Sequence, residues 1–277
     1  MADFLIHKLQ DKYTISYLSR GYQRKTSGFL LAKPQHNVDD IGDEAFQIFS
    51  KWHPKIALAV DENRRNGIEN ILKEKPETNL IILDDAMQHR RVKATVNIML
   101  TPSDKPFFQN CLFPAGSLRD IPSSAKRADI VVFTKGKQAN AESYNEWKSI
   151  WMKKNWSSKP FFVSSLKYLK PVNHSGIVLD SQIEVVSVAG LASNMLFFTY
   201  CKENFNVIKC ISKADHYRYL EDFFIQESLE DKTILTTEKD FHKLLSIAPN
   251  KEKIFYIPLQ IKLFPETSFL ETIENKL

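Results

Sequence analysis

Hydrophobic positions along this chain form short strand-like runs that alternate with amphipathic helical patterns. Alternation of this kind is typical of a mostly parallel sheet covered by helices. In the first part of the chain the pattern predicts strands at residues 14–18, 56–60, 79–83, 96–100, 130–134 and 161–166. It predicts helices there at residues 2–10, 44–51, 63–73 and 141–155. The expected fold class is therefore α/β.

A second series of strands and helices follows a polar connection at residues 170–176, which contains Pro171 and Gly176. Its predicted strands are 184–188, 207–211, 233–236 and 253–257. Its predicted helices are 194–203, 217–226, 238–246 and 268–276. We therefore expect two domains, a larger one at residues 1–172 and a smaller α/β domain at residues 173–277.

Composition narrows the class of protein further. Hydrophobic residues make up 43% of the 277 residues and charged residues 26%, which is the profile of a soluble globular protein. No apolar stretch approaches the roughly 20 residues that cross a bilayer. The three cysteines lack metal-binding or disulfide spacing, which favours a reducing cytosol. The net charge of +5 is spread along the chain, so it does not predict nucleic-acid binding but suits an anionic small molecule or membrane surface.

Two adjacent carboxylates, Asp84 and Asp85, come directly after the apolar strand at 79–83. Ligands of open α/β sheets bind at the carboxyl ends of strands. An acidic residue there resembles a Walker B strand, whose carboxylate holds Mg²⁺ directly or through water. A strand that simply ends in an acidic turn is the commoner explanation of the local pattern.

Asp43 follows Gly42 at the start of the helix expected at 44–51. Its carboxylate can cap that helix by accepting hydrogen bonds from the free N–H groups of the first turn. It can also accept a proton from a substrate hydroxyl at a strand-to-helix loop. From the local pattern alone, capping is the better explanation.

Two loops carry groups suited to an anionic ligand. Tyr22 follows the first strand, where its ring can pack on a sugar or lipid surface. Arg119 and Asp120 follow a Pro-Ala-Gly turn, where the acid can orient the guanidinium toward a phosphate. A solvated basic loop explains the first segment equally well, and a surface ion pair is the commoner explanation of Arg119 and Asp120.

His216 follows Asp215, and an adjacent acid can orient or charge an imidazole. An aspartate that caps a helix, followed by an incidental histidine, is the commoner arrangement. Farther along, Thr237 and Asp240 have the spacing of a helix cap, which predicts a structural role for that segment.

Each motif is ambiguous by itself, but their order along the chain is specific. The order is SRGYQR, GDEAFQ, VDENRRNGI, LDDAMQHR, FPAGSLRD, ADHYRY and TTEKD. It resembles the tetraacyldisaccharide 4'-kinases, or lipid A 4'-kinases, from about residue 2 to residue 240. The motifs GYQRKTSGF and VDENRRNGI resemble the branch of this family found in Bacteroidetes-type bacteria.

The resemblance implies a P-loop-NTPase-like kinase of lipid A biosynthesis, bound peripherally at the cytoplasmic face of the bacterial inner membrane. It implies ATP and Mg²⁺ as cofactors and a lipid A disaccharide precursor as the partner. Such an enzyme transfers the γ-phosphate of ATP to the 4'-hydroxyl of tetraacyldisaccharide 1-phosphate.

The same resemblance assigns roles to individual residues. Asp43 is expected to act as the base that takes the hydroxyl proton, assisted by His216. Asp84 and Asp85 are expected to serve Mg²⁺–ATP, with Gln88 nearby. The residues expected to line the nucleotide and lipid-substrate cleft are Tyr22, Glu44, Arg64, Arg119 and Asp120.

Three features depart from the family pattern. Met87 stands where members carry Phe or Leu, which is a tolerable apolar exchange. Asp120 stands where they carry Glu, which shortens the reach of the carboxylate. No glycine of the chain lies in a G-x-x-x-x-G-K-[ST] phosphate loop, since Gly136-Lys137 lacks the upstream glycine.

In the family that loop immediately precedes the helix that begins here at Ala2. The favoured interpretation is that Met1 is an internal methionine of a longer kinase. The alternative is a catalytically dead homologue that binds a lipid disaccharide or is vestigial. On either interpretation we expect the 277-residue chain to be inactive, because the loop supplies charge that neutralises the transferring phosphate.

Overall fold

The computed structural model describes residues 1–154 and 158–277, and their contacts group them into two units. Unit 1 comprises Met1–Leu5, Leu83–Lys167 and Gln260–Leu277, and unit 2 comprises Ile6–Ile82 and Tyr168–Leu259. Each unit is built from segments that are distant in sequence. The domain boundary expected between residues 172 and 173 stays a prediction.

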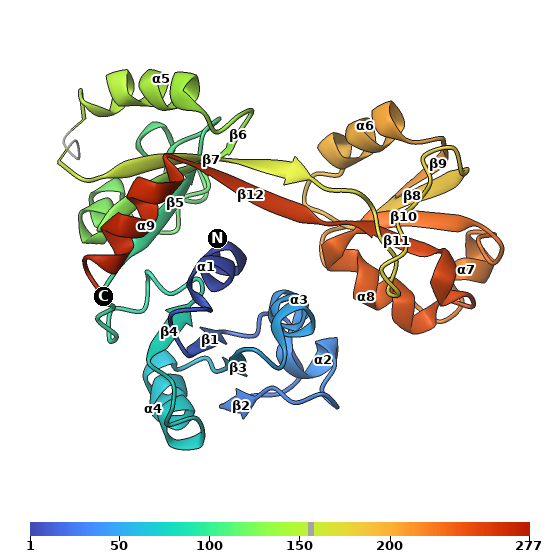
Figure 1. Cartoon of the computed structure of the whole chain (residues 1–277), viewed down its shortest axis with the longest axis horizontal. Coiled ribbons are helices and arrows are strands. Elements are labelled where there is room, and N and C mark those ends of the chain that lie inside the picture. Colours follow the sequence, from blue (N-terminus) through green and yellow to red (C-terminus); the bar gives the residue numbers. More distant parts are fainter. Residues whose placement is uncertain (155–157) are drawn as a thin grey trace. The chain divides into compact units, whose positions relative to one another are not determined.

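Unit 1 is built on a four-stranded sheet in the order β12-β7-β6-β5 (Figure 1). The strands are β5 (Ile98–Pro102), β6 (Ile130–Gly136), β7 (Phe161–Tyr168) and β12 (Leu259–Phe264). Strand β6 pairs in parallel with β5 and with β7. The helical elements are α5 (Ala141–Trp151), α9 (Glu266–Glu274) and the 3-10 turns Phe107–Gln109 and Pro122–Arg127. The end of the predicted helix 141–155, residue 155, lies outside the described residues.

Aromatic packing forms the core of unit 1. The ring of Phe133, on β6, stacks on Trp147 of α5 with centroids 4.0 Å apart, and the edge of Trp151 packs against it. Both tryptophans lie on one face of α5, because residues four apart meet on the same side of a helix. Met87 packs against this cluster, so methionine at this position lies in a hydrophobic environment.

Unit 2 contains two four-stranded sheets. The first has the order β2-β3-β1-β4 and consists of β1 (Ile15–Ser19), β2 (Leu30–Leu31), β3 (Ala57–Val60) and β4 (Leu80–Leu83). Strands β1 and β3 are parallel, and the short β2 pairs antiparallel with β3. All five residues of β1 are buried, as expected for a strand covered on both faces. Its helices are α1 (Ala2–Leu9), α2 (Val38–Ile41), α3 (Asp43–Trp52) and α4 (Arg64–Glu74).

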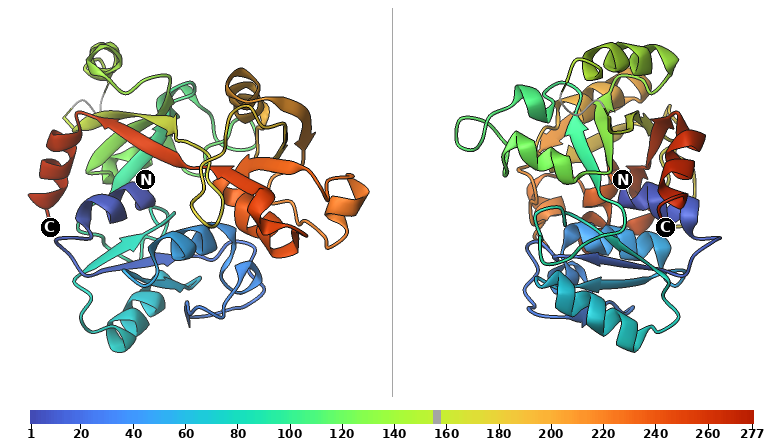
Figure 2. Two further views of the ribbon diagram at one scale, coloured as in Figure 1. Left: turned by 45° about the vertical axis from the view of Figure 1, so that its right-hand side comes forward. Right: turned by 90° about the vertical axis from the view of Figure 1, so that its left-hand side faces the viewer.

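Helices α3 and α4 both contact this sheet (Figure 2). Helix α3 buries Ala45, Phe49 and Trp52, which recur at intervals of four and three residues and therefore share one face. Helix α4 approaches β1 closely at Gly67, where an added methyl group would lie 2.8 Å from the Leu18 side chain. Helix α3, which carries Asp43 at its start, packs against β3 of the same sheet.

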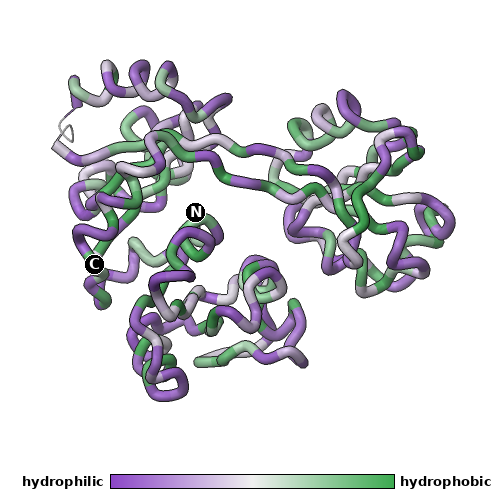
Figure 3. The backbone as a smooth tube through the Cα atoms, viewed as in Figure 1, coloured by the Kyte–Doolittle hydropathy of each residue, from purple (hydrophilic) through white to green (hydrophobic). Residues whose placement is uncertain are grey.

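The second sheet of unit 2 is fully parallel, in the order β11-β10-β8-β9. Its strands are β8 (Val185–Ala189), β9 (Val207–Ser212), β10 (Thr233–Thr237) and β11 (Ile254–Ile257). Figure 3 shows hydrophobic stretches of chain running through this sheet, and β8 is entirely buried. Its helical elements are α6 (Met195–Asn204), α7 (Phe223–Gln226), α8 (Glu238–Ile247) and the 3-10 turn Lys251–Lys253.

The structure confirms the α/β class and the predominance of parallel pairing, and it corrects one local prediction. The helix predicted at 217–226 is present only as α7, since residues 213–222 form turns and extended backbone. Tyr219 is buried in the core beside Phe223, so its apolar character reflects packing of a loop and not helical periodicity. Strand β12 and the short elements β2 and α2 were not predicted.

Gly42 is the position on which the start of α3 depends. It has φ 87° and ψ 155°, a region of backbone space that is essentially restricted to glycine. A Cβ atom there would lie 2.5 Å from the carbonyl oxygen of Tyr22. Glycine therefore allows the two backbone segments to touch just before Asp43.

We expect Gly42→Ala to destabilise the protein by more than the roughly 1–3 kcal/mol of backbone strain, because the clash with Tyr22 adds to that strain. Gly176→Ala is the matched control, since Gly176 has φ 78° but nothing within 4 Å of its added Cβ. Urea unfolding of both variants measures the difference. Equal losses of stability in the two variants would contradict this explanation.

Candidate functional site

Asp43 is the first residue of α3, and the N-cap before it is Gly42, which has no side chain to cap the helix. The expectation that Asp43 caps this helix is therefore wrong. Its carboxylate lies at the positive end of the helix dipole, which stabilises negative charge there. The side chain is only 9% exposed, so it needs hydrogen-bonding partners from other elements.

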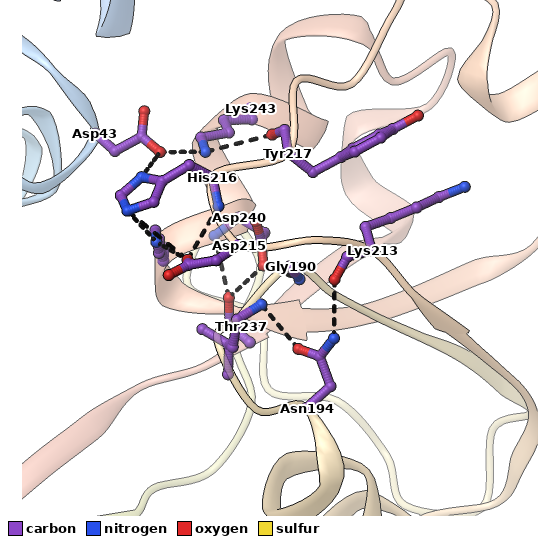
Figure 4. Close-up of polar contacts among 12 residues, drawn as sticks. Asp43, Gly190, Asn194, Lys213, Asp215, His216, Tyr217, Thr237, Asp240 and Lys243 are labelled. Carbon is purple, nitrogen blue, oxygen red and sulfur yellow. Dashed lines mark hydrogen bonds and ion pairs between the residues drawn. The ribbon is translucent and has the colours of Figure 1, made fainter. Parts of the chain in front are cut away.

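His216 supplies one of those partners (Figure 4). Its Nδ1 lies 3.1 Å from Oδ2 of Asp43, across a separation of 173 residues in the sequence. His216 lies in the loop that follows β9, with a left-handed φ of 57°, and its side chain is 15% exposed. The structure thus brings together two residues that the sequence motifs singled out separately.

Two lysines of α8 complete this cluster, and sequence analysis missed both. Lys243 donates to Oδ2 of Asp43, the same oxygen that contacts His216. Lys239 lies 3.3 Å from Nε2 of His216 and 2.5 Å from Oδ1 of Asp215. Their spacing of four residues within a predicted helix places them on one face, which was the available signal. We call these five residues the Asp43 cluster: Asp43, Asp215, His216, Lys239 and Lys243.

A buried carboxylate, Asp240, anchors the backbone around this cluster. Its Oδ2 accepts hydrogen bonds of 2.8 Å from the N–H of Gly190 and from the hydroxyl of Thr237. Thr237 in turn accepts from the N–H of Asp240, which confirms the predicted helix cap at the start of α8. Burial, and next the charge of Asp240, raise the pKa of Tyr219 in the neighbouring loop. Asp240 therefore ties the end of β8 to the start of α8, the helix that carries both lysines.

The other predicted residues of unit 2 lie around α3 and α4. The Tyr22 ring is 61% exposed and meets His216 edge-on, with centroids 5.5 Å apart. Glu44 is exposed beside Asp43 on α3. Arg64 is buried and donates to the carbonyl of Asp61 at 2.5 Å. Contact between these three residues and a substrate stays a prediction.

In unit 1 the acidic pair lies in the turn after β4. Asp85 has φ 46° and accepts two hydrogen bonds from Arg119, at 3.0 and 2.5 Å. This bidentate contact raises the pKa of Arg119. Gln88 is exposed a few residues farther along the same turn region. Arg119 was expected to pair with its neighbour Asp120, and the structure pairs it with Asp85 instead.

Asp120 forms its own ion pairs. It accepts from Arg127 at 2.7 Å and lies 3.7 Å from Arg90. A hydrogen bond from Ser124, with help from these arginines, holds the pKa of Asp120 below its usual value. The loop therefore presents carboxylates and guanidinium groups in pairs. An arginine of such a pair can release its carboxylate partner and bind a phosphate instead.

The carboxylates of Asp84 and Asp85 are hard oxygen ligands of the kind that Mg²⁺ binds together with waters and phosphate oxygens. The residues present therefore fit this ion. Within residues 1–154 and 158–277 no group of three or more His, Cys, Asp or Glu residues forms a ready metal site. Over the same residues, no helix has the length and apolar character needed to cross a membrane.

Comparison with known proteins gives one consistent result. The family described as Tetraacyldisaccharide-1-P 4'-kinase matches residues 1–277. A tetraacyldisaccharide 4'-kinase of Flavobacterium psychrophilum is 36% identical over 265 residues, which cover 93% of this chain and 76% of the relative. The enzyme of the same name from Cytophaga hutchinsonii is 33% identical, with 100% and 81% covered.

A crystal structure of LpxK from Aquifex aeolicus in complex with ATP superposes with a TM-score of 0.78. It is 26% identical in sequence, and the match covers 99% of this chain and 83% of the other. These findings confirm the resemblance indicated by the order of the sequence motifs. This chain belongs to the tetraacyldisaccharide-1-P 4'-kinase family.

Proposed function

We propose that the Asp43 cluster serves the transfer of the γ-phosphate of ATP to the 4'-hydroxyl of tetraacyldisaccharide 1-phosphate, a lipid A disaccharide precursor. The observation that carries this proposal is the contact between Asp43 and His216 in a chain of this kinase family. A carboxylate held by an imidazole is suited to receive a proton from an attacking hydroxyl group.

The geometry of Asp43 supports this role. The contacts from His216 and from Lys243 both fall on Oδ2. Figure 4 shows the other carboxylate oxygen turned away from both donors. Oδ1 can therefore face a substrate hydroxyl and take its proton as the hydroxyl oxygen bonds to the γ-phosphorus and ADP leaves. His216 keeps the carboxylate in that orientation.

In this proposal the acidic pair that follows β4 serves the nucleotide. Asp84 and Asp85 would hold Mg²⁺ with ATP, and Gln88 would lie nearby. When bound, Mg²⁺ neutralises negative charge on the phosphates. The remaining proposed contacts to nucleotide or lipid substrate come from Tyr22, Glu44, Arg64, Arg119 and Asp120.

Peripheral binding at the cytoplasmic face of the inner membrane is part of the same proposal. An acylated disaccharide resides in a membrane, so its kinase has to work at the membrane surface. The net charge of +5 favours attraction to anionic lipid headgroups.

A second candidate function is binding of the lipid disaccharide without catalysis. The observation in its favour is that the 277 residues contain no G-x-x-x-x-G-K-[ST] phosphate loop. That loop provides backbone N–H groups and a lysine to the phosphates in P-loop kinases.

We expect the purified 277-residue chain to bind tetraacyldisaccharide 1-phosphate saturably in mixed micelles. With ATP and Mg²⁺ it should turn over at less than about one hundredth of the rate of the Flavobacterium psychrophilum relative, because one set of phosphate contacts is missing. Mass spectrometry of the lipid products measures turnover, and phosphatidylglycerol with similar acyl chains is the binding control. Fast ATP-dependent turnover contradicts the inactivity, and absence of specific lipid binding contradicts the proposed substrate.

Asp43→Asn should lower any measurable kcat of this protein at least about 100-fold, since a positioned base contributes roughly 10²–10⁴-fold. The affinity for ATP should stay within about twofold of the unaltered protein. Asp11→Asn is the matched control, because Asp11 is exposed and lies outside the Asp43 cluster. A kcat within tenfold of the unaltered protein would remove Asp43 from the role of base.

A further inference from the structure

The loop that precedes Arg119 in unit 1 carries the most exposed of the large apolar side chains that the structure describes. Phe113 is 80% exposed, and Leu112 beside it is 42% exposed. Single exposed apolar residues are common on soluble proteins, so exposure by itself does not indicate a partner. Phe113 differs from such residues because its backbone is held in place and its surroundings are positively charged.

Residues 110–118, which we call the Phe113 loop, are hydrogen-bonded to one another. The N–H of Phe113 donates to the carbonyl of Leu118, and the N–H of Leu118 donates to the carbonyl of Cys111, both at 3.0 Å. Oδ1 of Asn110 accepts from the N–H groups of Cys111 and Ser117. The Leu118 side chain packs against the core of unit 1. The loop is therefore tied to the core and presents the Phe113 ring from a defined backbone.

Basic side chains lie next to this loop. Asp120, which follows it, accepts from Arg127 at 2.7 Å and lies 3.7 Å from Arg90. These contacts connect the end of the loop to the basic segment that continues from Arg90 to Arg91 and Lys93. Arg91 and Lys93 are both exposed, and neither forms an ion pair with another described residue. The exposed apolar side chains are thus accompanied by an excess of positive charge.

We propose that the Phe113 loop anchors the protein to an anionic phospholipid bilayer, with Phe113 and Leu112 in the headgroup region and the neighbouring basic side chains on lipid phosphates. Aromatic and leucine side chains beside lysine and arginine are the combination that binds membrane interfaces. Anionic lipid attracts each basic group that comes close to its surface. The proposal rests on the peripheral membrane binding proposed above and deepens it, because it names the surface that touches the lipid.

Charge and size both favour a bilayer over a second copy of this chain. In a symmetric dimer the same surface of each subunit would face itself, so the basic groups around the two loops would oppose one another. Two exposed apolar side chains also fall short of the roughly 1,000 Å² that a stable protein interface buries. A bilayer avoids both difficulties, since its phosphates neutralise the basic groups and its interface accepts a small apolar tip.

Helix α7 provides a matched control for exposure without positive charge. Ile225 is 66% exposed, and the exposed acidic residues Glu221 and Asp222 lie just before it in the chain. It therefore presents an apolar side chain in surroundings that an anionic bilayer repels.

The test is co-sedimentation of the 277-residue chain with vesicles of phosphatidylcholine, with and without phosphatidylglycerol, in low-salt buffer. We expect binding only to the vesicles that contain phosphatidylglycerol. Phe113→Ser should lower the partition coefficient at least about tenfold, because a phenylalanine ring no longer leaves water. Phe113→Trp keeps an aromatic ring and should restore binding. Arg91→Gln combined with Lys93→Gln should also lower it at least about tenfold, and Ile225→Ser by less than about twofold.

Unchanged partitioning of Phe113→Ser, or an equal loss in Ile225→Ser, overturns the anchor and leaves membrane binding of the protein standing. Absence of vesicle binding by the unaltered chain overturns both proposals. Sedimentation velocity without lipid tests for a second copy, because dimers that Phe113→Ser dissociates would assign the loop to self-association and overturn the anchor. Since neither ATP nor the lipid disaccharide is present, these results do not depend on the proposed phosphate transfer.

Discussion

One carboxylate oxygen, Oδ2 of Asp43, joins segments of unit 2 that lie 173 residues apart in sequence. His216 and Lys243 reach it from the loop after β9 and from α8, while α3 presents it from its first turn. Helix dipole and lysine charge both stabilise a carboxylate at this point. The loop after β9 and helix α8 therefore both meet the start of α3 at this one acceptor.

The elements that converge on Asp43 are themselves held by hydrogen bonds deeper in the fold. Asp240 ties Gly190, at the end of β8, to Thr237, at the start of α8. His216 adopts a left-handed backbone conformation, which is uncommon for a residue with a side chain. Such a conformation persists when surrounding contacts determine it, and it is often found at functional sites. His216, which has this backbone conformation, is also the residue that contacts the proposed base.

Sequence patterns predicted most strands and the long helices because burial follows the period of each element, as in α3. The same reasoning failed at 217–222, where Tyr219 is buried by a loop. No spacing rule links Asp43 to His216, and only the resemblance to a family joined them before the structure did. Arg119 pairs with Asp85, which is 34 residues away in the sequence. Local sequence patterns cannot predict such a pair, because it depends on how turns fold back on one another. Helical spacing could have placed Lys239 and Lys243 on one face of a helix, but no sequence pattern identified the residues that they contact.

The spacing of the two lysines has a consequence for how this protein can change in evolution. They extend from one helix, about 6 Å apart along its axis, toward different members of the Asp43 cluster. Loss of Lys243 would remove a contact to the Asp43 carboxylate, and loss of Lys239 would remove contacts to His216 and Asp215. Substitutions at Lys239 and Lys243 are therefore expected to be accompanied by compensating changes at Asp215 or Asp43. Since a change at Asp43 would remove the proposed base, Lys239 and Asp215 form the pair in which covariation has room to occur.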